Sequence, residues 1–161
     1  MPEYTGDAFG GTVGDDFRTS TPWWRPRPQP PDGAPNVLVV VLDDVGFAQL
    51  GCYGSDISTP VIDGLAGHGV QLSAFHTTAL CSPTRACLLT GRNHHRNGLG
   101  RIADLAMGYP GYDGEIPRDN GFLSEVLRDA GYATYAVGKW HLAPAHEMLL
   151  GGPRTRWPLS K

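Results

Sequence analysis

The hydrophobic positions of the chain alternate between strand-like runs and helix-like stripes. Residues 37–42 (VLVVVL) form an unbroken apolar run, typical of a strand buried on both faces of a parallel sheet. We also expect residues 70–75 and 132–137 to form two further strands. Polar residues follow the first and third segments, at Asp43-Asp44 and at Lys139 and His141.

Three helices are expected around these strands. A Ser-Thr-Pro sequence at 58–60 supplies a cap and a helix start before an apolar stripe at positions 62, 65 and 66. A second helix opens at Ser82-Pro83 and stops at Gly91, and a third covers 122–130 and stops at Gly131. The alternation of strands and helices predicts an α/β fold with a largely parallel sheet, in which ligands bind beyond the carboxyl ends of the strands.

Two regions break this alternation. Residues 1–34 contain prolines interleaved with Trp and Arg, so we expect an extended arm, with a proline-rich ligand for a partner domain as the alternative. Residues 91–118 are rich in Gly, His, Asn and Pro, and are expected to form a long loop region, of a kind that is usually either functional or disordered. The remainder, 35–161, is expected to belong to one α/β domain.

Composition narrows the class of protein. The 161 residues carry 13 basic and 16 acidic side chains, a net charge of −3, which offers no basic surface for nucleic acid. No run approaches the roughly 18 apolar residues that cross a bilayer, so no membrane partner is expected. The three cysteines contain no CxxC pair, which argues against a disulfide framework or a structural zinc site. No secretory signal is visible, so we expect a cytoplasmic protein rather than a periplasmic or secreted one.

The Asp43-Asp44 pair is a candidate metal site. Two carboxylates directly after a buried strand supply hard oxygen ligands of the kind that Ca²⁺ and Mg²⁺ prefer. A solvated acidic turn or a helix cap would use the same two residues. The sequence leaves both interpretations open.

The segment from Cys81 to Arg85 is a candidate anion site. A helix that begins here directs unsatisfied N–H groups and the positive end of its dipole towards Cys81. Arg85 in the first turn adds a guanidinium suited to a tetrahedral oxyanion. Taken alone, this pattern predicts a nucleophilic cysteine beside an anionic substrate, and the alternative is a core cysteine with a surface arginine.

Other chemically capable residues give weaker signals. Lys139 and His141 could supply a cation and a proton-transfer group, or could simply be exposed after a strand. His94 and His95 could bind a metal or be solvated. Residues 98–103 match the spacing of a dinucleotide-binding turn, but no strand precedes them, so we reject that interpretation.

These motifs together resemble the sulfatases of the alkaline phosphatase superfamily, most closely bacterial arylsulfatases. Residues 79–91 (ALCSPTRACLLTG) and 131–141 (GYATYAVGKWH) are similar to the two family signatures, and 36–46 (NVLVVVLDDVG) looks like the metal-binding first strand. The resemblance implies a three-layer α/β/α fold with a largely parallel, mixed sheet. It also implies a sulfuric ester hydrolase acting on a small sulfate ester.

The resemblance assigns a role to each candidate residue. A separate formylglycine-generating enzyme would convert Cys81 to Cα-formylglycine, whose hydrated diol is the nucleophile and whose oxygen also contacts the metal. Asp43 and Asp44 would ligate Ca²⁺, with Mg²⁺ as the alternative. Arg85 would stabilise the diol, Lys139 would bind sulfate, and His141 would hydrogen-bond the nucleophile.

The resemblance covers about residues 35–144, whereas the family domain is several hundred residues long. Its further metal ligands, a second His and a second Lys have no counterpart after His141. We therefore expect residues 35–161 to be the N-terminal part of a catalytic domain, with little or no activity alone. The alternatives are a formylglycine-dependent phosphonate monoester or phosphodiester hydrolase, and a non-catalytic truncated product.

Overall fold

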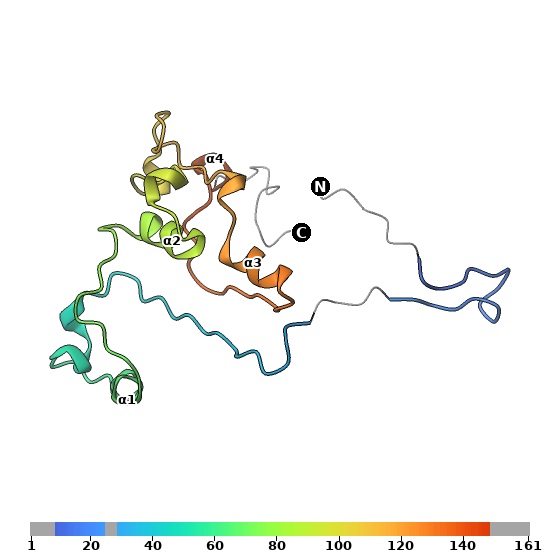
Figure 1. Cartoon of the computed structure of the whole chain (residues 1–161). Helices are drawn as coiled ribbons and strands as arrows, with labels where there is room; N and C mark the ends of the chain where they lie inside the picture. Colours follow the sequence, from blue (N-terminus) through green and yellow to red (C-terminus); the bar gives the residue numbers. More distant parts are fainter. Residues whose placement is uncertain (1–8, 25–28, 149–161) are drawn as a thin grey trace.

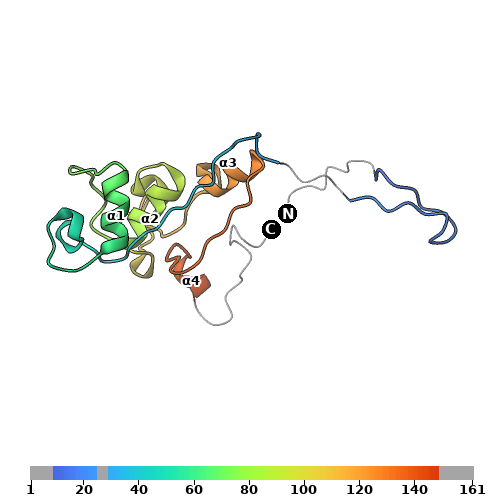
Figure 2. The ribbon, with the colours of Figure 1, turned by 90° about the horizontal axis from the view of Figure 1, so that it is seen from below.

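The computed structural model describes residues 9–24 and 29–148. Its α-helices in these ranges are α1 (Pro60–His68), α2 (Cys81–Thr90), α3 (Leu123–Asp129) and α4 (Ala145–Met148), shown in Figures 1 and 2. Short 3-10 turns lie between them: η1 (Phe47–Gln49), η2 (Gly51–Tyr53), η3 (His94–Asn97), η4 (Ala103–Leu105) and η5 (Arg118–Asn120). None of the helices in the described ranges has the length and apolar character needed to cross a membrane.

Helix α2 forms where the sequence predicts it. Its first turn contains Pro83, which is fully buried and whose fixed φ suits a helix start. The helix ends at Gly91, which adopts the left-handed conformation (φ 66°) and donates its N–H to the carbonyl of Cys87 at 2.8 Å. That cap conformation favours a residue without a Cβ, so Gly91 stops the helix as expected.

Helices α1 and α3 are also confirmed, but the stripe of α1 is not a core face. Leu65 is 69% exposed and Val61 is 77% exposed, and no residue of the helix is buried. The start of α1 is held instead by polar contacts, because the Thr59 hydroxyl donates to Asp63 Oδ1 and accepts from the N–H of Gly51, both at 2.8 Å. Hydrophobic spacing identified the helix correctly and its environment wrongly.

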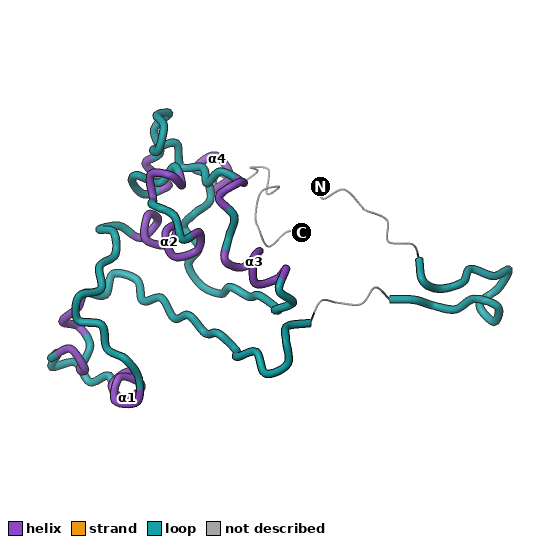
Figure 3. The backbone as a smooth tube through the Cα atoms, in the orientation of Figure 1, coloured by secondary structure: helices purple, strands orange, loops and turns teal. Residues whose placement is uncertain are grey.

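The predicted parallel sheet is absent from the described residues, which contain no β-strand (Figure 3). Residues 37–42 run as an extended segment whose six apolar side chains are 41–88% exposed, and Val137 in the third segment is fully exposed. No backbone hydrogen bond joins residues 35–45 or 133–138 to another described residue. A strand forms only when a neighbour accepts and donates its backbone hydrogen bonds, and these segments have no such neighbour here.

The region 91–118, expected to be a loop, is irregular in backbone but contains several buried residues. The side chain of Asn97 is fully buried and donates to the Thr90 hydroxyl at 2.9 Å, while it accepts from Asn120 at 2.8 Å. Gly98 (φ 69°) lets the backbone approach Glu115, whose carbonyl oxygen lies 2.5 Å from where a Cβ would be. Buried amides with full sets of partners stabilise irregular backbone that has no sheet or helix ladder.

A small apolar core joins this region to α2 and to the chain before α4. Its buried members are Ala86, Leu99, Ala103 and Leu142, and partly buried Leu89, Ile116 and Trp140 pack against it. Ala86 comes from α2, Ala103 from η4, and Leu142 from the segment that leads to α4. The core therefore fixes three segments that are far apart in sequence.

Residues 9–24 form a separate small unit. An antiparallel bridge joins Thr12 and Thr21, with backbone N–H···O distances of 3.1 and 2.9 Å. The rings of Phe9 and Trp23 meet edge to face with centroids 6.1 Å apart. The division at residue 34 into an arm and a domain stays a prediction.

The missing strand pairing predicts a distinct pattern of amide hydrogen exchange. Amides 37–42 and 133–137 should exchange at rates close to those of an unstructured peptide, because no partner protects them, whereas those of α2 should be protected. Exchange followed by mass spectrometry with peptide-level resolution measures both in one sample. Protection of 37–42 equal to that of α2 would contradict the absence of strand pairing.

A candidate active site at the start of α2

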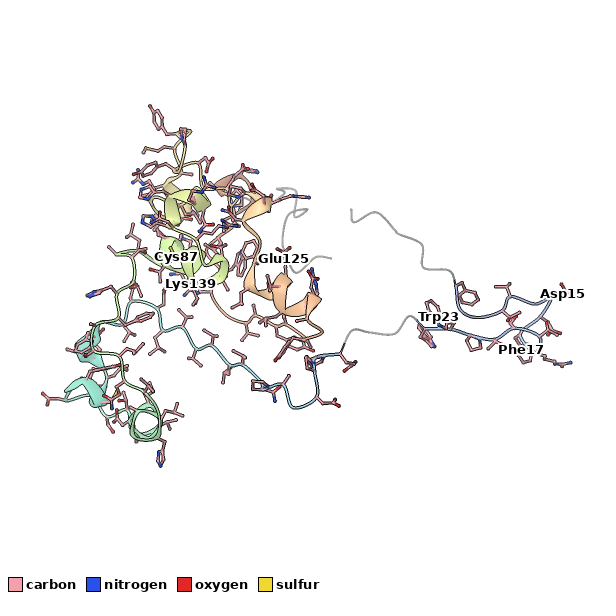
Figure 4. The ribbon with its side chains drawn as sticks, in the orientation of Figure 1. Asp15, Phe17, Trp23, Cys87, Glu125 and Lys139 are labelled. Atoms are coloured by element: carbon pink, nitrogen blue, oxygen red, sulfur yellow. The ribbon has the colours of Figure 1, made fainter. Side chains whose placement is uncertain are left out.

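Two predicted site residues lie one turn apart on α2. Cys81 is the first residue of the helix and Arg85 is four residues later, a spacing that places both side chains on one face. Ser82 and Pro83 between them are buried, so the helix start is anchored in the protein on its other side. Lys139 lies close to α2 (Figure 4), and its backbone carbonyl accepts a hydrogen bond from Arg85.

Asp43 joins two cations from distant parts of the chain. Its Oδ1 is 3.1 Å from Arg85 Nη2, and its Oδ2 accepts from Lys139 Nζ at 2.5 Å. Arg85 Nη1 also donates to the backbone carbonyl of Lys139 at 2.6 Å. The side chain of Arg85 is 13% exposed, against 33% for Asp43 and 41% for Lys139, so the guanidinium is the least solvated of the three.

These contacts shift the titration of two groups. Hydrogen bonds from Lys139 and then Arg85 hold the pKa of Asp43 below its ordinary value of 3.8, and the hydrogen bond to Asp43 raises the pKa of Lys139 above 10.5. The contribution of Asp43 to stability is therefore present above pH 3.8 and is lost as the pH falls through its lowered pKa. That of Lys139 is present below pH 10.5 and is lost as the pH rises through its raised pKa.

His141 contacts the candidate nucleophile. Its Nδ1 lies 3.1 Å from Cys81 Sγ, and its side chain is 15% exposed. The backbone of His141 is left-handed (φ 57°), which costs a residue with a Cβ about 1–2 kcal/mol. The only other non-glycine residue with positive φ in the described ranges is Asp44 (φ 56°), so both such residues are predicted site residues.

The structure brings together Asp43, Cys81, Arg85, Lys139 and His141, but not Asp44. Asp44 is exposed, and no hydrogen bond or ion pair joins it to another described residue. Within residues 9–24 and 29–148, no three His, Cys, Asp or Glu side chains converge to hold a metal ion. Because Ca²⁺ takes six to eight oxygen ligands, the donors present do not by themselves fit a complete calcium site.

The donors at the helix start do fit an oxyanion. Arg85 Nε is buried and has no hydrogen-bond partner among the described residues. A buried donor without an acceptor is unfavourable by about 1–3 kcal/mol, and an oxygen of a bound anion would satisfy it. Arg85 Nε, the Lys139 ammonium and the α2 N-terminus thus supply positive charge around Cys81.

The histidines of the loop region make local contacts instead. His94 Nδ1 lies 3.2 Å from the carbonyl oxygen of Leu99, and His95 Nε2 lies 3.1 Å from the Tyr112 hydroxyl.

The sequence patterns did not indicate the roles of two residues next to the site, Asp104 and Ser82. Asp104 contacts His141, and the Ser82 hydroxyl accepts from the N–H of Ala103 at 3.2 Å.

Replacing Lys139 with Met should raise the pKa of Asp43 towards 3.8 without restoring it fully, because Arg85 remains. Carboxylate ¹³C NMR titration in a chelating buffer measures this, with Asp43→Asn to assign the signal. Arg128→Met, which removes an exposed cation on α3, is the matched control and should leave that pKa unchanged. An unchanged Asp43 pKa in Lys139→Met would contradict the ion pair.

Known proteins are similar to this chain in sequence. The family model described as Sulfatase matches residues 35–147. A sulfatase of Schizosaccharomyces pombe is 45% identical over 115 residues, which cover 67% of this chain and 21% of that protein. The arylsulfatase of Klebsiella aerogenes is 34% identical over 110 residues, covering 67% of this chain and 24% of that enzyme. The N-acetylgalactosamine-6-sulfatase of Canis lupus familiaris is 42% identical over 120 residues, covering 71% and 22%.

The chain thus spans roughly a fifth to a quarter of the length of these relatives. The matched region contains every residue of the cluster, from Asp43 to His141. It also covers more than half of the chain. The protein belongs to the sulfatase family.

Proposed function

We propose that this chain carries the nucleophile-bearing part of an arylsulfatase-type sulfuric ester hydrolase. The observation that carries the proposal is that His141 contacts Cys81 at the start of α2, while Arg85 of the same helix meets Lys139 and Asp43. Family membership implies an alkaline phosphatase-like α/β fold and a sulfate ester substrate. The three-layer arrangement with a mixed sheet remains part of the proposal, since the described residues contain no strand.

Each residue of the cluster has a distinct task in this proposal. Arg85 stabilises the diol at position 81 and Lys139 binds the sulfate, and their preorganised charge stabilises the negative charge that develops during ester cleavage. Asp43 holds the two cations together through both of its carboxylate oxygens. His141 orients a proton at position 81 through its Nδ1.

The proposal also requires a modification of Cys81 and a bound metal ion, which the amino-acid sequence does not itself supply. Conversion of Cys81 to Cα-formylglycine by a formylglycine-generating enzyme would supply a hydrated aldehyde as the oxygen nucleophile. Asp43 and Asp44 would contribute carboxylates to a Ca²⁺ site, or a Mg²⁺ site, whose other ligands lie outside the described residues.

A related chemistry is the second candidate. A formylglycine-dependent phosphonate monoester or phosphodiester hydrolase would use the same cluster, because phosphonate and sulfate are both tetrahedral oxyanions that suit a guanidinium and an ammonium. The names of the relatives, an arylsulfatase and an N-acetylgalactosamine-6-sulfatase, favour sulfate.

Maturation of Cys81 tests the catalytic role directly. Co-expression with a formylglycine-generating enzyme should lower the mass of the Cys81 peptide by about 18 Da, the change from thiol to aldehyde. Cys87, half-buried on the same helix, is the internal control and should stay a thiol. If the Cys81 peptide keeps the mass of the thiol, the chain is a non-catalytic product and the proposal fails.

Turnover provides a second test. The matured chain should hydrolyse an aryl sulfate at least ~10²-fold more slowly than the Klebsiella arylsulfatase, since the described residues lack a complete metal site. The rate of hydrolysis is measured on an aryl sulfate and on an aryl phosphonate. The Arg85→Lys variant is measured in parallel, because lysine keeps the positive charge but lacks the planar set of N–H donors of the guanidinium. A rate close to that of the relative would show that the residues present suffice, and faster phosphonate turnover would favour the second candidate.

A further inference from the structure

The contact between Cys81 and His141 continues to a third side chain, Asp104. Nε2 of His141 lies 3.1 Å from Asp104 Oδ2, while the other ring nitrogen, Nδ1, lies 3.1 Å from Cys81 Sγ. An ionised carboxylate can only accept, so Nε2 carries the proton and donates it to Asp104. In the neutral ring, Nδ1 is then the acceptor and faces residue 81.

We propose that Asp104 is a positioning residue that fixes the tautomer and the ring orientation of His141 towards residue 81. A carboxylate on the far nitrogen excludes the tautomer with the proton on Nδ1, because Nε2 would then meet Asp104 as one acceptor facing another. It also limits rotation of the ring, since the two contacts lie on opposite sides of the imidazole.

A buried hydrogen bond fixes Asp104 relative to the nucleophile. The N–H of Ala103 donates to Ser82 Oγ at 3.2 Å, and both residues are fully buried. Ser82 directly follows Cys81, and Ala103 directly precedes Asp104 in turn η4. Residue 81 is therefore linked to Asp104 in two ways. One path runs through the His141 side chain, and the other through the hydrogen bond between Ser82 and Ala103.

The core supports the same arrangement from the other side. Ala103 and Leu142 belong to one buried cluster, and they are the neighbours of Asp104 and His141 in the chain. The Asp104 side chain is 51% exposed, however, and the His141 side chain is 15% exposed. A partly exposed pair contributes little to stability, so we assign the contact to orientation rather than to folding.

The consequence for catalysis rests on the proposed function, but the contact itself can be tested without any sulfatase activity. The test uses the unmodified 161-residue chain with ¹⁵N-labelled histidine, at one fixed pH at which the ¹⁵N shifts themselves show the ring to be neutral. Long-range ¹H–¹⁵N correlation distinguishes the two tautomers of His141. A His141→Gln variant assigns the signals.

In the wild type, Nε2 of His141 should be the protonated nitrogen and Nδ1 the unprotonated one, with no second tautomer. In Asp104→Ala, the two nitrogen shifts should move towards each other as the tautomers interconvert, while the helical circular dichroism is unchanged. Asp104→Glu, which keeps a carboxylate, should restore the wild-type pattern at least in part. Asp119→Ala changes an exposed aspartate at the equivalent position of turn η5 and should have no effect.

Iodoacetamide labelling at one fixed pH gives an independent readout. Loss of the oriented imidazole in Asp104→Ala should slow alkylation of Cys81 several-fold, while Cys52 and Cys87 react as before and serve as internal references. A mixture of tautomers in the wild type, or unchanged shifts and rates in Asp104→Ala, overturns the proposal. So does an equal effect of Asp119→Ala. Failure of formylglycine formation would leave these results untouched, and so separates this inference from the proposed function.

Discussion

The arrangement of the site depends on one small apolar cluster. Ala86, Leu99, Ala103 and Leu142 pack together although the first and last of them are 56 residues apart in the chain. Three of them directly adjoin a site residue: Arg85, Asp104 and His141. Burial of these short side chains therefore sets the positions of the charged and nucleophilic groups, which their own exposed contacts could not do. The hydrogen bonds and ion pairs among these groups then fix the conformations of their side chains.

Asp43 shows how electrostatics complements this packing. It is bonded to Lys139 across 96 residues of sequence, and the carboxylate neutralises part of the repulsion between that ammonium and Arg85. The left-handed backbone at Asp44 and His141 is a local cost, and at His141 the side-chain contacts with Cys81 and Asp104 help to offset it. Charge concentration, backbone strain and an unpartnered guanidinium nitrogen thus occur together at the start of α2.

The sequence predicted what is local and missed what depends on distant partners. α2 was predictable because Pro83 and Gly91 act through their own backbone conformations. The strand at 37–42 was not, since its hydrophobicity says nothing about whether a neighbour is present to accept its hydrogen bonds. Cys81 and Arg85 could be found from their helical spacing, whereas Asp104 could not, because a single Asp in an irregular segment has no pattern. The position of Asp104 beside the site depends on its neighbour Ala103, which is buried in the core and hydrogen-bonded to Ser82.

The central claim is that this core holds the site in place within the chain itself, and methyl NMR tests it most directly. With the alanine and leucine methyl groups labelled, nuclear Overhauser contacts should connect Leu142 with the methyls of Ala86 and Ala103. Leu105, exposed on the same turn as Ala103, should show no such contact with Ala86 and serves as the reference. Absence of the Leu142 contacts in a sample whose α2 is folded would contradict the account.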